Sequence, residues 1–263
     1  MPNNYKQIKF ELGADGVALI TLNRPEKLNA MNDEMRHDFT DLQDELNRNK
    51  AIKVIIFTGA GRAFSAGGDI DFLDQDWLTT DFRRETQEFT AFFDALEVLE
   101  KPVIAAVNGP CTGAGLQITL SCDLRIASEE AAFGFRENRI GLLPGAGGCS
   151  RLVKLIGYGK AKELIFTGEM INANKAEEIG LINRVVKHEI LLEEAFKLAR
   201  HLLTRAPVAL GLVKRVLWNC VNVDMHTGRH LESLAQSILI KTEDHKEGIQ
   251  AFREKRKPRF QGK

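Results

Sequence analysis

Short apolar runs rich in β-branched residues alternate with amphipathic patterns along most of the chain. Several of these runs end at a glycine, which is typical of strands buried on both faces of a parallel sheet. They occupy residues 16–22, 53–59, 102–109, 123–128 and 181–186. Apolar residues at helical spacing lie between them, namely Met35, Phe39, Leu42 and Leu46, and then Phe89, Phe92, Leu96 and Leu99. The alternation predicts an α/β fold in which strand, loop and helix repeat as stacked turns.

After residue 186 the strand pattern stops and a helical pattern takes over. Leu191, Ala195, Leu198 and Leu202 mark one apolar stripe, and the remainder of the chain carries almost no strand signal. We therefore predict two regions, a core over residues 1–188 and a helical region over residues 189–263. The apolar surface of the helical region is expected to close over the core or to pack on another subunit.

Composition narrows the class of protein. A chain of 263 residues with 44% hydrophobic residues can bury a large core. The 36 basic and 36 acidic residues balance, so no overall field attracts nucleic acid or an anionic membrane. The four cysteines form no C-x-x-C pair, and no export signal or membrane-spanning run is apparent. We expect reduced thiols and a cytoplasmic location.

Two local patterns suggest ligand sites but also have plain structural explanations. The loop over residues 59–70 follows a strand, yet Phe64 stands where a dinucleotide-binding loop needs glycine, and no P-loop lysine is present. It is either a tight turn or a place where Gly67 and Gly68 leave N–H groups bare for an anion. His226 and His230 share a helix face, but Thr227 replaces the glutamate of a metalloprotease. A solvated helix face is favoured there, and no metal is predicted.

Two further segments contain polar residues beside glycine. In GPCTGAGLQ, small residues at 113–115 indicate the start of a helix with unpaired N–H groups, and Gln117 follows within one turn. In FRENRIGLLPGAGG, Glu137 comes after a predicted strand and before a loop rich in proline and glycine. Close helix packing and a surface glutamate are the simpler readings of each segment taken alone.

Taken together, these segments resemble the enoyl-CoA hydratase/isomerase, or crotonase, family. Their order and spacing match the family in AFSAGGDI (63–70), VNGPCTGAGL (107–116), SCDLRIAS (121–128) and FGFRENRIGLLPGAGGCSRL (133–152). Further matches are ITLNRPEKLNAMN (20–32), GEMINANKAEEIGLINRVV (168–186) and EGIQAFREKRKPRF (247–260). The resemblance covers nearly the whole chain. It implies a crotonase-like spiral of ββα turns, with a C-terminal helical region that builds homotrimers, often paired into hexamers.

The resemblance also implies a substrate and a set of site residues. Family members bind an acyl-CoA thioester and stabilise its enolate with two backbone N–H groups, which by position are those of Gly68 and Ala114. Coenzyme A is part of the substrate, so no separate cofactor is implied. The coenzyme A contacts implied by position are Arg24, Lys27, Ala30, Ala66, Asp69, Ile70 and, from the tail of this or a neighbouring subunit, Lys255. Asp71 departs from the basic residue often found there, which leaves one phosphate contact in doubt.

Gln117 bears on the choice of reaction. Hydratases that the chain resembles pair two glutamates across the acyl chain, whereas here only Glu137 is a carboxylate and Gln117 cannot ionise. Moving a double bond from the 3 to the 2 position needs one acid/base, so the pattern favours an isomerase. Hydration, with Gln117 orienting a water that Glu137 activates, stays open.

Two classes without enzymatic activity are also compatible with the pattern. The family includes a member that binds RNA, and the tail REKRKPR is basic, but the zero net charge and the two Trp and two Tyr argue against nucleic acid binding. An inactive oligomeric scaffold is the other alternative. Retention of Glu137 and of both glycine-rich loops argues against it.

Overall fold

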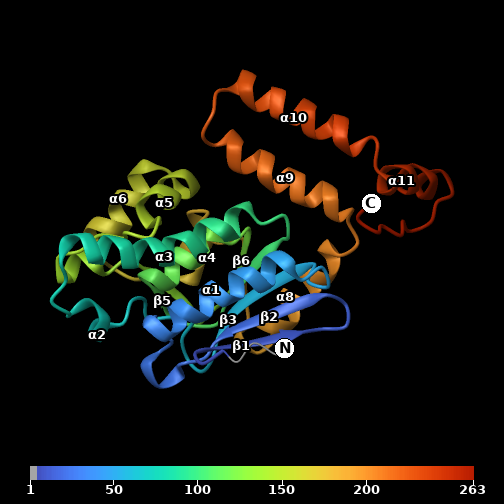
Figure 1. Ribbon diagram of the computed structural model, residues 1–263. Helices are drawn as coiled ribbons and strands as arrows, with labels where there is room; N and C mark the ends of the chain where they lie inside the picture. The colour runs from blue at the N-terminus through green and yellow to red at the C-terminus, as the bar shows by residue number, and fades with distance from the viewer. Residues whose placement is uncertain (1–4) are drawn as a thin grey trace.

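A six-stranded sheet forms the centre of the molecule in the computed structural model, which describes residues 5–263 (Figure 1). In spatial order its strands are β1 (Ile8–Leu12), β2 (Val17–Leu22), β3 (Val54–Gly59), β4 (Val103–Val107), β6 (Leu124–Ser128) and β9 (Arg184–Val186). The strands from β2 to β9 run parallel, and β1 pairs antiparallel with β2 at one edge. All five predicted apolar runs therefore contribute to one sheet.

A second, smaller sheet lies beside the first. It consists of β5 (Cys111–Thr112), β7 (Ala132–Gly134) and β8 (Ile171–Asn172). In the chain, β5 follows β4 and β7 follows β6, so successive turns give one strand to each sheet before the next helix. This is the spiral of ββα turns that the sequence predicted.

Both faces of the large sheet are covered, which explains why its strands read as continuous apolar runs. On β3, Ile55 and Phe57 belong to the cluster that includes residues of α1 (Asp33–Arg48), α3 (Thr79–Val98) and α4 (Ala114–Ser121). Val54 and Ile56 point to the opposite face and pack with Leu191, Ala195 and Ala199 of α8 (Leu191–Leu202). Alternate residues of one strand thus supply two separate cores.

The spiral also contains several shorter helical elements. They are α2 (Ile70–Leu73), α5 (Gly148–Ile156), α6 (Tyr158–Thr167), α7 (Ala173–Glu178) and single 3-10 turns at Pro25–Lys27, Glu137–Ile140 and His188–Ile190. Within residues 5–263, no helix is long and apolar enough to cross a membrane.

The last three helices project from the spiral as an arm (Figure 1). They are α9 (Pro207–Cys220), α10 (Met225–Leu239) and α11 (Glu243–Arg253). The arm is joined to the core by Lys214, whose Nζ donates to the carbonyl oxygens of Leu96 and Lys101 at 2.7 and 3.1 Å and to Asp123 Oδ2 at 2.8 Å. The predicted region 189–263 therefore contains a helix that covers the sheet, α8, and an arm. Its division from the core at residue 188 stays a prediction.

Candidate active site

A cavity of about 230 Å³ lies between α2, α3, the start of α4 and the loop before α5. Most of its wall is apolar and is formed by Met31, Phe72, Leu73, Phe82, Phe89, Leu142 and Leu143. The polar side chains on the wall are Thr86, Gln117 and Glu137, and Gly68, Ala114, Gly145 and Ala146 complete it. The cavity therefore accepts an apolar group and places it against one carboxyl group and one amide.

The backbone N–H groups of two cavity-lining residues, Gly68 and Ala114, have no partner in the described part of the chain. Met31 pairs with Gly68 as a parallel bridge, in which Met31 N–H donates to Gly67 O at 2.8 Å and Asp69 N–H donates to Met31 O at 2.9 Å. That pattern turns the Gly68 N–H away from the bridge. Ala114 is the first residue of α4, where no earlier turn offers an acceptor. Within residues 5–263, neither N–H donates a hydrogen bond.

A glycine contact brings these two N–H groups together. Gly67 has φ +97°, and a Cβ there would lie 3.0 Å from Thr112 O and 3.3 Å from the Ala114 nitrogen. Only glycine allows that backbone conformation and that approach together. The two loops therefore touch directly. The N–H of Gly68 and that of Ala114, the latter at the N-terminus of α4, can hold an oxygen that becomes negatively charged.

Gln117 is held in one orientation by three hydrogen bonds. Its Oε1 accepts from Ala146 N–H at 2.6 Å and from Gly148 N–H at 3.2 Å, and its Nε2 donates to Glu137 Oε1 at 3.2 Å. The side chain is buried. Because two donors meet Oε1, the amide must turn its Nε2 toward the carboxylate. The predicted pair of Gln117 and Glu137 therefore meets at the cavity.

Glu137 begins a 3-10 turn just after β7, which brings its carboxyl group to the cavity wall. Oε1 accepts from Gln117, while Oε2 is buried and has no hydrogen-bond partner in the described part of the chain. Burial raises the pKa of this carboxyl group, because the charged form loses water. A carboxylate with one held oxygen and one free oxygen is suited to take and return a proton.

Most of the residues predicted to contact coenzyme A lie together at two loops. Arg24 forms an ion pair with Asp69 and donates to Ala30 O at 3.2 Å, while Ala66 N–H donates to Leu28 O at 2.9 Å. Burial acts to raise the pKa of the Asp69 carboxyl group, but the hydrogen bond from Arg24 and other donors lower it overall. Arg24 is thus engaged within the protein and links the two loops.

Three other predicted coenzyme A residues are more exposed. Lys27 Nζ lies 3.9 Å from Asp71 Oδ2, so the unexpected aspartate lies beside a predicted phosphate contact. The side chain of Ile70 is exposed. Lys255 lies on the arm just after α11 and does not line the cavity in this chain. The coenzyme A contacts stay predictions.

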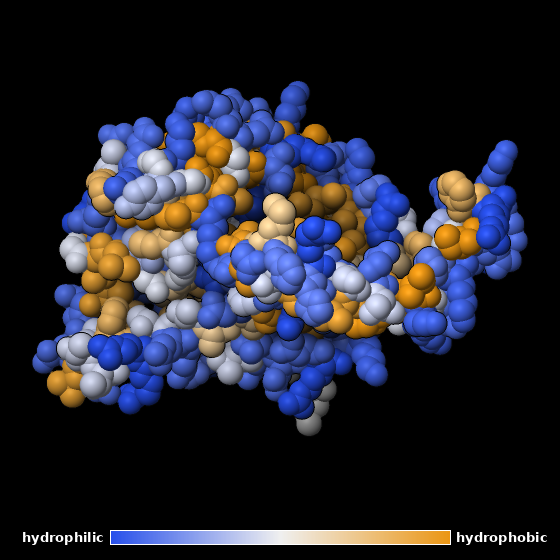
Figure 2. Space-filling model, turned by 90° about the horizontal axis from the view of Figure 1, so that it is seen from above, coloured by the Kyte–Doolittle hydropathy of each residue, from blue (hydrophilic) through white to orange (hydrophobic). Residues whose placement is uncertain are grey.

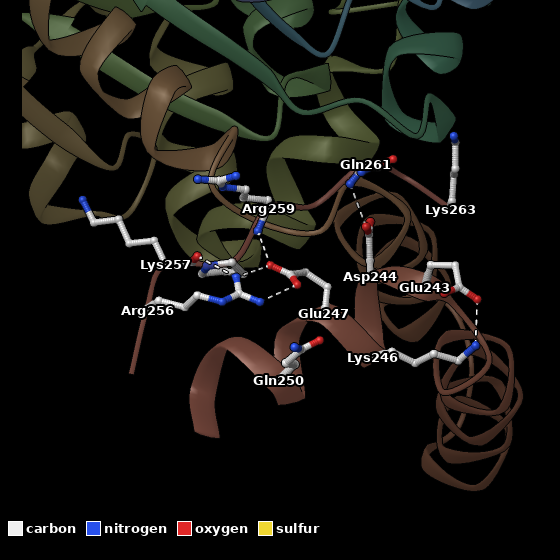
Figure 3. Close-up of a pocket in the computed structure, with 11 residues that line it drawn as sticks. Glu243, Asp244, Lys246, Glu247, Gln250, Arg256, Lys257, Arg259, Gln261 and Lys263 are labelled. Carbon is white, nitrogen blue, oxygen red and sulfur yellow. Dashed lines mark hydrogen bonds and ion pairs between the residues drawn. The ribbon is translucent and has the colours of Figure 1, made fainter. Parts of the chain in front are cut away.

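A larger and more open hollow, of about 1040 Å³, lies on the arm between α11 and the residues that follow it (Figure 3). Arg256 crosses its wall and pairs through both terminal nitrogens with Glu247, at 2.6 and 2.8 Å. Asp244 accepts the N–H groups of Gln261 and Gly262. These bonds hold the tail on α11, and the hollow lacks the apolar lining of the cavity beside Glu137.

Comparison with known proteins decides the family. The family model described as enoyl-CoA hydratase/isomerase matches residues 13–263. The chain belongs to the enoyl-CoA hydratase/isomerase family. It is therefore an enzyme of the acyl-CoA-acting type, and the spiral fold is the family fold.

Members of the enoyl-CoA hydratase/isomerase family that are named for different reactions are similar to this chain. The short-chain-enoyl-CoA hydratase of Clostridium acetobutylicum is 41% identical, over 92% of each chain. The 1,2-epoxyphenylacetyl-CoA isomerase of Escherichia coli is 37% identical, over 94% of this chain and 96% of its own length. The crystal structure of an enoyl-CoA hydratase from Bacillus anthracis has a TM-score of 0.94 at 37% identity, covering 98% of this chain and 100% of that one.

The sequence did not predict the groups that support the pair of Gln117 and Glu137. Ala146 and Gly148 donate to Gln117, and Arg151 donates to Ala146 O at 2.9 Å. The available signal was the loop rich in proline and glycine at residues 144–148, which precedes a helix. Such a loop predicts bare N–H groups but not the side chain that they meet.

Proposed function

We propose that this enzyme moves the double bond of an acyl-CoA from the 3 to the 2 position, with Glu137 as its only acid/base. The observation that supports this most directly is that Glu137 is the single ionisable side chain among the described residues that line the cavity. An isomerisation of this kind needs one group that takes a proton from one carbon and returns it to another. Hydration needs a proton taken from the attacking water and a proton given to the alpha carbon, work that is usually shared by two carboxyl groups.

The reaction uses the free oxygen of Glu137 and the two bare N–H groups. Glu137 Oε2 removes the proton from the carbon next to the thioester, and the electron pair moves onto the thioester oxygen as a dienolate. The N–H groups of Gly68 and Ala114 hold that oxygen in an oxyanion hole, where each donor contributes about 3–4 kcal/mol in comparable sites. The same proton then returns to the carbon at the far end of the dienolate, and the double bond becomes conjugated.

Gln117 has a supporting part in this proposal. Its Nε2 donates to the Glu137 carboxylate, and its Oε1 already accepts two N–H groups, so the amide neither carries a proton nor readily turns over. It holds one carboxylate oxygen and leaves the other directed at the substrate.

Hydration of a 2-enoyl-CoA is the second candidate. It is favoured by the name of the 41% identical relative, a short-chain-enoyl-CoA hydratase. In this case Gln117 Nε2 would orient a water with its second hydrogen, and Glu137 would activate that water.

We further propose an assembly and a setting for this activity. Coenzyme A arrives as part of the substrate, and no separate cofactor is needed for the proton transfer. The apolar residues exposed on the arm support a homotrimer or a hexamer made of two trimers. A cytoplasmic location is supported by the four cysteines, which are all free thiols.

The test is a direct comparison of the two reactions. Purified protein is assayed with 3-enoyl-CoA and 2-enoyl-CoA esters of several chain lengths, alongside Gln117→Glu. We expect the parent to act mainly on the 3-enoyl ester. Gln117→Glu restores a second carboxyl group at constant volume, so its hydration of the 2-enoyl ester should rise by at least about tenfold.

The measurement for hydration is the loss of the absorbance of the conjugated thioester, at equal concentrations of active sites. Isomerisation by the variant should stay level or fall. If the parent already hydrates the 2-enoyl ester quickly and Gln117→Glu does not increase that rate, the hydratase proposal replaces the isomerase proposal.

A further inference from the structure

Arg151 lies behind the site, buried between α5 and α3. Its Nη2 pairs with Asp94 and with Glu97, the latter at 2.7 Å, and both carboxylates are on α3. Its Nη1 donates to Ala146 O at 2.9 Å. The guanidinium therefore joins the helix that lines the apolar wall to the loop before α5.

That loop is the one that orients Gln117. Ala146 uses its C=O to accept from Arg151 and its N–H to donate to Gln117 Oε1 at 2.6 Å. Gly147, with φ +88°, lies directly against the guanidinium, since a Cβ there would be 1.8 Å from Arg151 Nη1. Gly148 then donates to the same Gln117 oxygen at 3.2 Å. The loop is folded around the arginine on one side and the glutamine on the other.

We propose that Arg151 is a positioning residue, which fixes the Ala146 peptide and so keeps the Gln117 amide turned with its Nε2 toward Glu137. This inference rests on the proposed role of Glu137 as the acid/base. Arg151 is not among the described residues that line the cavity. Its effect passes through Ala146 and Gln117.

The consequence for Glu137 has a definite sign. A donor at Oε1 favours the charged carboxylate, whereas a turned amide would place its own oxygen there and disfavour that charge. Without Arg151 the pKa of Glu137 should therefore rise above its already raised value. The carboxylate must be ionised to act as a base. As the pH is lowered, the variant should therefore lose activity at a higher pH than the parent does.

The other groups near Glu137 should not mask this change in its pKa. Gln117 of α4 donates to Glu137, and the thiol of Cys149 of α5 is near enough to respond to its charge. Thr86 of α3 lines the same cavity but donates its hydroxyl to Phe82 O at 2.9 Å. Burial first, and then the charge of Glu137, raise the pKa of that thiol, which favours its neutral form. Within residues 5–263, no cation lines the cavity. Because Arg151→Met also removes a positive charge, a shift in the pH profile is assigned to the amide only where a variant that keeps the arginine shifts in the same direction.

The chain contains a matched control for the loss of a buried ion pair. Arg36 of α1 is 8% exposed, as is Arg151, and it too pairs with two carboxylates of α3, Glu85 and Glu88. In both arginines Nε is buried without a partner in the described structure. The partners of Arg36 in the described structure are Asp33, Glu85 and Glu88, and none of these hydrogen-bonds Gln117. Arg36→Met thus removes a comparable ion pair on the same helix without touching the proposed connection.

The experiment measures kcat and KM against pH for the ester that the parent turns over, in Arg151→Met, in Arg36→Met and in the double variant Asp94→Asn with Glu97→Gln. Arg151→Met should move the acidic limb of kcat upward by about one pH unit, so that kcat at the acidic end falls about tenfold. The alkaline plateau should stay within about threefold and KM within about twofold of the parent. The double variant should shift the limb in the same direction, and Arg36→Met should not shift it.

Several outcomes would overturn the proposal. Circular dichroism and Tm identify the variants that fold. The proposal is contradicted if a folded Arg151→Met keeps the acidic limb of the parent, or if Arg36→Met shifts that limb by the same amount. Should Arg151→Met not fold, the double variant, which keeps the arginine, decides instead. In a Gln117→Met background, Arg151→Met should add no further shift, since the connection is already broken. Full activity of Glu137→Gln would refute the proposed function itself, whatever the arginine does.

Discussion

The cavity region and the C-terminal arm differ in how far they bury their residues within the chain. The short helix α4, beside the cavity, has eight residues and buries seven of them, among them Gln117. The helices α9 and α10 of the arm are 14 and 15 residues long, and each buries a single glycine. Residues at the site are therefore fixed by packing within the chain, whereas those of the arm are not.

The arm also exposes large apolar side chains. They include Val213, Leu217 and Trp218 on α9, Met225, Leu234 and Ile238 on α10, and Phe252 on α11. Figure 2 shows apolar residues at the projecting end of the molecule, on the right of the view. An exposed apolar surface of this kind is typical of a protein interface. The comparison teaches that the candidate site is enclosed by packing within one chain, whereas the apolar surface of the arm is left exposed.

The largest effect expected from this difference is that of Glu137→Gln. The change removes the proton carrier and alters little volume, so turnover should fall by about a thousandfold or more, while acyl-CoA binding survives. Subunit association, which we assign to the arm, should be unchanged. Steady-state kinetics and light scattering measure the two properties. Turnover within about threefold of the parent would remove Glu137 from the mechanism.

A smaller but still large effect is expected at the proposed oxyanion hole. Gly68→Pro removes one N–H donor and should lower turnover by about a hundredfold or more. Gly68→Ala is the matched control, because its Cβ would meet only Leu73, at an ordinary 3.6 Å, and its N–H is retained. It should keep most of the activity. Circular dichroism and the size of the oligomer show whether each variant folds, and an active, folded proline variant would contradict this role.

The arm itself gives the third prediction, whose effect on the chemistry should be smallest. A chain ending at Arg205 retains α8, which covers the sheet, and should fold while losing association. A chain ending at His188 lacks α8 and exposes the apolar face of Val54, Ile56 and Ile104, so it should be insoluble. Light scattering and circular dichroism distinguish the two chains. If the chain ending at Arg205 associates as the full chain does, the arm is not the interface.

Much of the fold could be predicted because burial on both faces leaves a plain pattern. The run at residues 53–59 became β3 over Val54–Gly59, and the stripe from Met35 to Leu46 became α1. Of the strand predicted at residues 181–186, only the second half forms a strand, β9. Gly180, with φ +78°, ends the turn after α7, and Leu181 packs into the core before β9 begins at Arg184. The edge strand β1 was missed, because its outer residues are exposed.

The candidate site could be predicted only as far as single positions carry a signal. Gln117 and Glu137 were predicted from their motifs, and the structure brings them together. The pairing of Arg24 with Asp69 was not predicted, because it joins loops that are 45 residues apart. The same holds for Arg151 and Asp94, 57 residues apart. Contacts of this kind depend on how the turns of the spiral stack, so no local sequence pattern predicts them.

The two N–H groups that hold Gln117 have an evolutionary consequence. Ala146 and Gly148 offer donors to an oxygen, and a carboxylate oxygen would satisfy them as well as an amide oxygen does. Glutamine and glutamate codons differ by one base, so a single point mutation can exchange the two groups with no change in the loop that receives them. A lineage that carries this loop can therefore move between one and two carboxylates while its fold stays the same.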